Sequence, residues 1–231
     1  MKIALLGYGK MGKTIERLAE ERGHEIIFRI TEDIEKYDLQ KADVAIDFSV
    51  PDAAFNNITT CFKKQIPVIS GTTGWLKRYE EAVKICKEND AAFIYASNFS
   101  LGVNLFFELN RQLAQMMKNF PEYKIGIEEI HHTQKLDAPS GTAITLAEQI
   151  IAASGKTGWK LDKASDNELP ITAKRIENVP GTHVISYESP VDTIKIEHVA
   201  HSRDGFALGA IVAAEWLQHK KGIFSMKDVL F

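Results

Sequence analysis

Short apolar runs alternate with polar, helix-compatible stretches through the first hundred residues. The runs are KIALL (2–6), EIIFRI (25–30), DVAIDFS (43–49), IPVIS (66–70) and AAFIYA (91–96). Their nearly continuous apolar character is typical of strands that are covered on both faces. The segments between them that favour helices are 13–22, 52–64 and 75–89. This alternation predicts a parallel α/β sheet.

The pattern changes after about residue 98. The later segments predict helices at 103–118, 142–153 and 206–218, and strands at 124–130, 182–189 and 192–200. In the last strand Ile194 and Ile196 alternate with Lys195 and Glu197, so one face of the strand is exposed to solvent or contacts a partner. The polar segment 155–170 is the expected mobile insert.

The composition excludes several classes of protein. The 231 residues are 45% hydrophobic and 26% charged with a net charge of -3, which is typical of a soluble globular protein. The chain has no basic stripe, so we expect no nucleic-acid partner. Its longest apolar run, GFALGAIVAA, is too short to span a membrane. Cys61 and Cys86 form no metal-binding pattern and suit the reduced thiols of a cytoplasmic protein.

A glycine-rich turn follows the first predicted strand and opens the first predicted helix. The segment GYGKMG has the spacing G-x-G-x-x-G, which suits a tight turn, close approach of a pyrophosphate and close helix packing. Together with the strand pattern, it predicts a Rossmann-type dinucleotide domain. Glu32, 20 positions after Gly12, would bind the ribose, although Asp33 and Glu35 are neighbouring acids. The alternative is a turn that merely needs glycines. The candidate residues are Gly7, Tyr8, Gly9, Lys10, Met11, Gly12 and Glu32.

Two further loops follow predicted strands at the end of the sheet where ligands bind. They are SGTTGW (70–75) and ASNFSLGVN (96–104). Their small residues, hydroxyls and amides suit the nicotinamide half of a dinucleotide. The alternative is that both are ordinary loops. The candidate residues are Gly71, Thr72, Thr73, Ala96, Ser97, Asn98 and Phe99.

The segment EEIHHTQKLDAPSGTAITLAEQI (128–150) has the most distinctive chemistry. His131 and His132 end a strand and therefore point to opposite faces, so we expect no metal site from the pair. A histidine and the nearby Lys135 could supply a proton and bind an anionic substituent. The alternative is a solvated polar loop.

A helix start follows directly in the same segment. Ser140 can cap the helix, and Gly141 and Thr142 then expose N–H groups and a hydroxyl to an anion. The chain has no G-x-S-x-G elbow, and Ser140 has no obvious base, so a hydrolase triad is not expected. The alternative is that Ser140 only caps the helix and that solvent satisfies the rest.

The segment HHTQKLDAPSGTA closely resembles the signature of the dihydrodipicolinate reductase family. GYGKMG, DFSVP, GTTG, SNFSLGVN, VPGTH and HSRDGFALGA follow in the order found in that family. The resemblance implies reduction of 4-hydroxy-tetrahydrodipicolinate, in the diaminopimelate route to lysine, with a hydride from NADH or NADPH. It implies catalytic roles for His131 and Lys135, and a substrate carboxylate held by His132, Lys135, Ser140, Gly141 and Thr142.

The resemblance also implies two domains and a homotetramer. We expect a dinucleotide domain of 1–98 plus 206–231, and an α+β substrate and tetramerisation domain of 99–205. Some family members carry a basic residue after the ribose-binding acid, whereas here Asp33 follows Glu32. We therefore expect NADH to be used at least as well as NADPH. The rival interpretations are another small Rossmann dehydrogenase, of an amino-acid or semialdehyde type, and a nucleotide-sensing protein without turnover.

Overall fold

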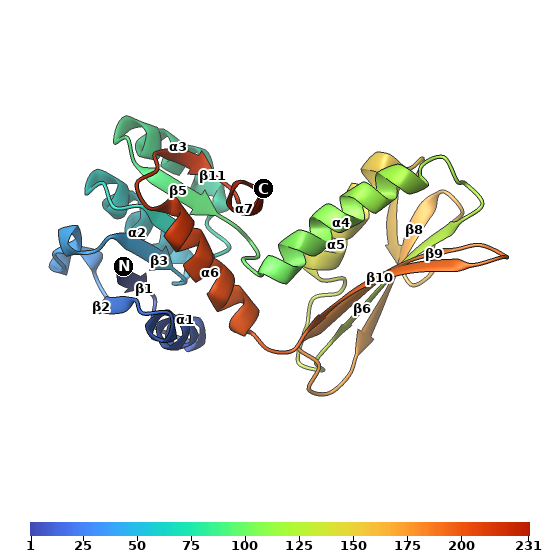
Figure 1. The fold of residues 1–231 in the computed structure, drawn as a ribbon, viewed down its shortest axis with the longest axis horizontal. Helices are drawn as coiled ribbons and strands as arrows, with labels where there is room; N and C mark the ends of the chain where they lie inside the picture. Colours follow the sequence, from blue (N-terminus) through green and yellow to red (C-terminus); the bar gives the residue numbers. More distant parts are fainter. The chain divides into compact units, whose positions relative to one another are not determined.

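The computed structural model describes all 231 residues. The chain forms two compact units, of which the first contains Met1–Leu101 and Asp204–Phe231 and the second contains Gly102–Arg203. Each unit has its own β-sheet (Figure 1). No helix is both long enough and apolar enough to pass through a membrane.

The first unit contains a six-stranded sheet in the order β11-β5-β4-β3-β1-β2. All of its pairings are parallel, as the alternating sequence pattern predicted. The strand β11 at the C-terminal end was not predicted. The strands are β1 Lys2–Leu6, β2 Glu25–Ile30, β3 Val44–Asp47, β4 Val68–Ser70, β5 Ala92–Tyr95 and β11 Gly222–Phe224.

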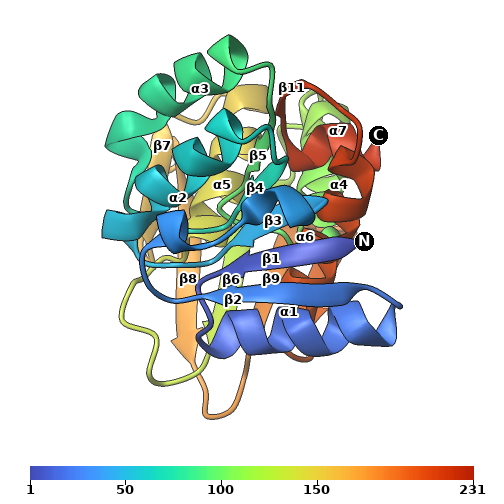
Figure 2. The same ribbon diagram turned by 90° about the vertical axis from the view of Figure 1, so that its left-hand side faces the viewer.

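Helices cover both faces of this sheet. Ile3 and Leu5 pack against α1 and α6, whereas the alternate residues Ala4 and Leu6 pack against α2 and α3. Figure 2 shows α2 and α3 side by side. Because successive strand residues face opposite sides, both sets are apolar, which explains the continuous apolar runs. The helices are α1 Lys10–Glu21, α2 Pro51–Lys63, α3 Tyr79–Glu88, α6 Asp204–Leu217 and α7 Met226–Leu230.

The second unit contains a mixed five-stranded sheet in the order β10-β9-β6-β8-β7. The neighbours β6, β8 and β7 run parallel, whereas β9 is antiparallel to both β6 and β10. One hydrophobic core joins this sheet to α4 and α5. The elements are α4 Leu101–Met117, β6 Lys124–His131, α5 Gly141–Ala153, β7 Gly158–Leu161, β8 Glu168–Arg175, β9 Gly181–Glu188 and β10 Thr193–Ala200.

The prediction of a mobile insert at 155–170 was wrong. The segment contains β7 and the start of β8, and Leu169 and Ile171 are fully buried in the core. The abundance of Asp, Lys and Asn in this segment hid the strands, and Pro170 is itself unusual inside a sheet. The pairing of β8 with β6 begins only at Ile171, so Pro170 interrupts no hydrogen bond on that side. The strand is therefore compatible with its proline.

Candidate active site

The glycine-rich turn lies between β1 and α1 in the first unit. Gly7 has a φ of +95°, and a Cβ there would lie 2.2 Å from the carbonyl oxygen of Phe48. A Cβ on Gly12 would lie 2.5 Å from the carbonyl oxygen of Gly7. A Cβ on Gly9, by contrast, would meet no atom within 4 Å. Gly7 and Gly12 thus allow the tight turn and the close helix, while Gly9 between them leaves open space.

The N-terminus of α1 has the features of an anion site. Gly9 occupies the capping position without a side-chain cap, and the first turn contains no acidic residue. Lys10 and Lys13 lie on the first turn and are both exposed. The partial positive charge and free N–H groups of a helix N-terminus favour a bound anion. The side chain of Met11 packs against the core instead.

Side chains around the predicted ribose acid are paired with one another. Glu32 is exposed and accepts hydrogen bonds from Lys36 and from the Tyr37 hydroxyl, the latter at 3.3 Å. The Asp33 carboxylate accepts a hydrogen bond from the backbone N–H of Glu35 in the same turn. Lys36 was missed by the sequence analysis, and it places a cation beside the acid that would bind the ribose.

The other basic residue near this end of β2 is turned elsewhere. The Nε of Arg29 donates to Glu16 at 2.7 Å. The Tyr8 hydroxyl donates to the same Glu16 carboxylate, and the Arg29 guanidinium lies 5.9 Å from the centre of the Tyr8 ring. Arg29 is therefore held against α1 and does not pair with Glu32.

A buried carboxylate, Asp47, ties the loops that follow β3 and β4 together. It accepts hydrogen bonds from the hydroxyls of Thr72 at 2.7 Å, Ser70 at 2.8 Å and Ser49 at 2.6 Å. Burial raises the pKa of Asp47, and these hydrogen bonds oppose that rise. The sequence analysis did not single out Asp47. Asp47 holds the Thr72 hydroxyl, which also accepts a hydrogen bond from the Ser49 N–H at 2.9 Å, so the two loops are connected.

The predicted nicotinamide loops contain both exposed and internal residues. Thr73 and Ser97 are exposed, whereas Thr72 and Phe99 are buried. A Cβ on Gly71 would lie 2.2 Å from the Phe48 ring, so the loop packs tightly there. Since the Phe99 side chain lies in the core, only its backbone remains for a ligand. The half-buried Ala96 and Asn98 lie between Tyr95 and Phe99 on the same loop.

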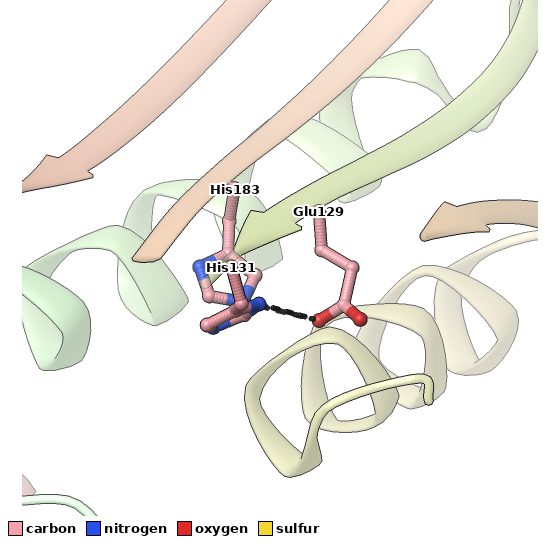
Figure 3. Close-up of side chains that lie close together, drawn as sticks. All are labelled: Glu129, His131 and His183. Atoms are coloured by element: carbon pink, nitrogen blue, oxygen red, sulfur yellow. Dashed lines mark ion pairs between the residues drawn. The ribbon is translucent and has the colours of Figure 1, made fainter. Parts of the chain in front are cut away.

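The second unit brings its polar residues together through strand register. In the pairing of β6 with β9, Glu129 lies opposite His183. In the pairing of β6 with β8, His131 lies opposite Arg175. Glu129 and His131 are two residues apart and share one face of β6. Figure 3 shows Glu129, His131 and His183 gathered on that face.

The carboxylate of Glu129 is fully buried at the centre of this cluster. It accepts hydrogen bonds from the Arg175 guanidinium at 3.1 Å and from the Ser140 N–H at 3.0 Å. Nδ1 of His131 forms an ion-pair contact with it at 3.3 Å, without the alignment of a good hydrogen bond. Burial would raise the pKa of Glu129, but interactions with His131, Ser140 and Arg175 outweigh burial and lower the pKa to about 2. Glu129 is therefore ionised.

His183 is neutral in this cluster. Burial, followed by the nearby His131, lowers the pKa of His183 to about 4. The ligand atoms of Glu129, His131 and His183 lie within 4.8 Å of one another, close enough to hold a metal ion. However, Arg175 already neutralises the carboxylate, and a metal cation there would meet the guanidinium at short range. The cluster suits a hydrogen-bonded network better than a metal site.

The loop after β6 presents Lys135 and His132. The Lys135 ammonium pairs with Asp137 at 2.8 Å. Arg175 donates to the backbone oxygens of Asp137 at 2.8 Å and Lys135 at 3.3 Å, and so supports this loop. His132 is half-buried and lines a pocket of about 350 Å³ with residues that include Arg203. As predicted for neighbours on a strand, His131 and His132 have different surroundings.

The three residues at the start of α5 differ in their contacts and in their exposure. The Ser140 hydroxyl is buried, caps the helix by accepting from Ala143 N–H at 3.2 Å, and lies against His183. Gly141 is the first helical residue, and a Cβ there would meet no atom within 4 Å. Thr142 is half-buried. The Ser140 side chain is thus already engaged, whereas the space beside Gly141 is open.

Comparison with known proteins identifies the family. The model "Dihydrodipicolinate reductase, N-terminus" matches residues 24–99, and "Dihydrodipicolinate reductase, C-terminus" matches residues 102–230. A 4-hydroxy-tetrahydrodipicolinate reductase from Christiangramia forsetii is 64% identical over 233 residues, covering 100% of this chain and 98% of that protein. The chain belongs to the dihydrodipicolinate reductase family. This member is accordingly an oxidoreductase that uses a pyridine nucleotide, as the sequence resemblance predicted.

More distant relatives agree with this family assignment. A 4-hydroxy-tetrahydrodipicolinate reductase from Methanosarcina barkeri is 37% identical over 196 residues, covering 82% of this chain and 73% of that protein. A dipicolinate-bound dihydrodipicolinate reductase from Paenisporosarcina sp. TG-14 has the same fold. Its TM-score is 0.77 at 22% identity, with 97% of each chain covered. The Rossmann-type sheet with a second mixed-sheet unit is therefore the fold of this reductase family.

Proposed function

We propose that this protein reduces 4-hydroxy-tetrahydrodipicolinate to tetrahydrodipicolinate. In that reaction the substrate gains a hydride and a proton and loses one water. The relative from Christiangramia forsetii, which matches the whole chain, carries this activity in its name. The observation that carries the proposal is the shared carboxylate of Glu129, which contacts both His131 at 3.3 Å and the Ser140 N–H at 3.0 Å. It joins a proton-bearing ring to an anion-binding helix start.

The first unit is proposed to hold the dinucleotide, which supplies the hydride when bound. The uncapped start of α1, beside the open space at Gly9, suits its pyrophosphate. Glu32 would accept hydrogen bonds from the ribose. The loops at 71–73 and 96–99 would position the nicotinamide, and the hydrogen bond from Thr72 to Asp47 holds the first of them in place.

The second unit is proposed to hold the substrate and to supply the proton. Lys135 and the N–H groups of Gly141 and Thr142 would bind a carboxylate, with His132 as a further donor. The Asp137 carboxylate holds the Lys135 ammonium in the loop until the substrate carboxylate replaces it. The N–H bond of the His131 ring would break as its proton passes to the substrate.

The experiment that tests this proposal supplies the purified protein with the product of the preceding synthase and NADH or NADPH. The expected result is loss of the 340 nm absorbance of the reduced dinucleotide, about one molecule for each molecule of substrate consumed. A nucleotide-sensing protein would bind the dinucleotide without oxidising it. Another small dehydrogenase would oxidise it only with an amino-acid or semialdehyde substrate in place of the heterocycle.

We also propose a homotetramer assembled through the second sheet. The strand β10 lies at the edge of that sheet and pairs only with β9. Ile194 and Val199 on this strand are exposed, and an open edge with apolar side chains suits pairing with another chain. Light scattering that showed a monomer at micromolar concentration would contradict the proposal. A cytoplasmic location, expected from the unpaired Cys61 and Cys86, can be checked by cell fractionation.

A further inference from the structure

Burial of the Glu129 carboxylate costs free energy. This side chain is fully buried, and an ionised carboxylate loses much hydration on burial unless charged and polar partners replace water. The structure supplies such partners in Arg175 and the Ser140 N–H. None of these three groups contributes to the apolar core. We therefore explain the arrangement by its effect on His131, the remaining neighbour of the carboxylate, and not by a contribution to the core.

We infer that Glu129 and Arg175 are positioning residues that fix the protonated nitrogen of His131. Nδ1 of His131 is fully buried and faces the Glu129 carboxylate. An ionised carboxylate only accepts hydrogen bonds, so the nitrogen that faces it carries the proton. Nε2 then faces the substrate. It takes up a proton from solvent, and the Glu129 carboxylate stabilises the resulting imidazolium. The Nε2–H bond breaks when this proton passes to the substrate, while the Nδ1 proton stays on the Glu129 side. The inference rests on the proposed function, in which His131 transfers the proton.

The ring is confined on its other side by Gly181 at the start of β9. A Cβ on Gly181 would lie 3.1 Å from Nε2 and 3.3 Å from Cδ2 of His131. The glycine thus leaves the space that the imidazole uses. Glu129 sets which nitrogen is protonated, and Gly181 sets how close the ring lies to the strand.

Arg175 extends this arrangement to the substrate loop. The same guanidinium that binds Glu129 also donates to the backbone oxygens of Lys135 and Asp137. A planar guanidinium has several donors in fixed directions, which a lysine ammonium does not reproduce. Arg175 therefore couples the orientation of His131 to the position of Lys135, although its own interactions are with protein groups.

The test measures the protonated nitrogen of His131 by ¹⁵N NMR of histidine-labelled protein. At about pH 8.5 an ordinary imidazole is neutral, so its two tautomers are distinguishable. The His131 signals are assigned by their loss in His131→Gln. We expect a proton on Nδ1 in the natural protein. In Glu129→Gln the amide NH₂ can donate to Nδ1, so the proton should move to Nε2.

The kinetic readout accompanies the NMR measurement. In Glu129→Gln, kcat should fall about 10- to 100-fold, as part of the roughly 10²–10⁴ that a positioned acid contributes. The Kd of NADH should not change. The matched control is Glu128→Gln, because Glu128 is the adjacent strand residue and pairs with Lys174 at 2.5 Å instead. The control should keep both the tautomer and kcat.

A second variant keeps the inference testable if Glu129→Gln does not fold. Gly181→Ala should push the ring by a few tenths of an ångström and lower kcat, while the proton stays on Nδ1. A proton on Nε2 in the natural protein, or an unchanged tautomer and kcat in Glu129→Gln, would overturn the inference. Failure of the proposed function would look different, since the natural protein would then not oxidise NADH with the heterocycle, whatever the tautomer of His131.

Discussion

Nε2 of His183 lies 3.1 Å from the hydroxyl oxygen of Ser140, and both side chains are almost completely buried. The contact links β9 to the residue that caps α5. Burial, and then the nearby His131, lowers the pKa of His183 to about 4. His183 is therefore neutral in the folded protein, whereas in the unfolded chain the same histidine binds a proton below about pH 6.5.

The low pKa of His183 predicts acid destabilisation over a defined range. Its contribution to stability is fully present above about pH 6.5 and is lost as the pH falls towards 4, by roughly 3 kcal/mol in total. Glu129, with a pKa lowered to about 2, loses its contribution at lower pH. Unfolding free energies at pH 7 and pH 4.5 should therefore differ less in His183→Gln than in the natural protein. Equal losses in both proteins would rule out His183 as the cause.

The start of α5 is predicted to bind a carboxylate of the substrate. Thr142→Val keeps the side-chain shape but removes one donor, which should cost roughly 1.5–3 kcal/mol of binding. The KM for substrate and the Ki for pyridine-2,6-dicarboxylate should both rise about tenfold or more, with an unchanged Kd for the dinucleotide. If the helix start is only capped by Ser140, inhibitor binding in Thr142→Val will stay as it was.

Dinucleotide preference is predicted from the charges near Glu32. Glu32 and Asp33 place negative charge where a 2′-phosphate would lie, so NADH should be used at least as well as NADPH. Lys36, which pairs with Glu32, would be released in Glu32→Ser and should raise kcat/KM for NADPH relative to NADH. Glu35→Ser, a nearby exposed acid, serves as the control. A more than tenfold preference of the natural protein for NADPH would contradict this prediction.

Local sequence predicted the first unit well because its strands are buried on both faces. Runs such as KIALL send Ile3 and Leu5 to one helix layer and Ala4 and Leu6 to the other, so burial is visible in the residues themselves. The start of α5 was equally visible, since Ser140 is followed by an apolar helical pattern. These features depend on neighbours in sequence and on elementary backbone geometry.

The parts that were missed depend on partners distant in sequence. The polar composition of 155–170 indicated a loop, whereas β8 is stabilised by pairing with β6, which starts at Ile171. Glu129 lies two residues before His131, so a shared strand face could have been inferred. Its relation to His183 and Arg175 arises from register between strands about 45 to 55 residues apart along the chain, which no local pattern encodes. Charged partners of that kind become apparent only in the fold.

His131 is proposed to supply the proton in the reduction, and the kcat of His131→Gln tests this assignment. Removing a positioned acid should lower kcat by about 10²–10⁴. Fluorescence titration should show an almost unchanged Kd for NADH, because the proposed dinucleotide residues lie in the other unit. A strongly reduced kcat with normal NADH binding is the predicted result. A kcat close to that of the natural protein would exclude His131 as the proton donor.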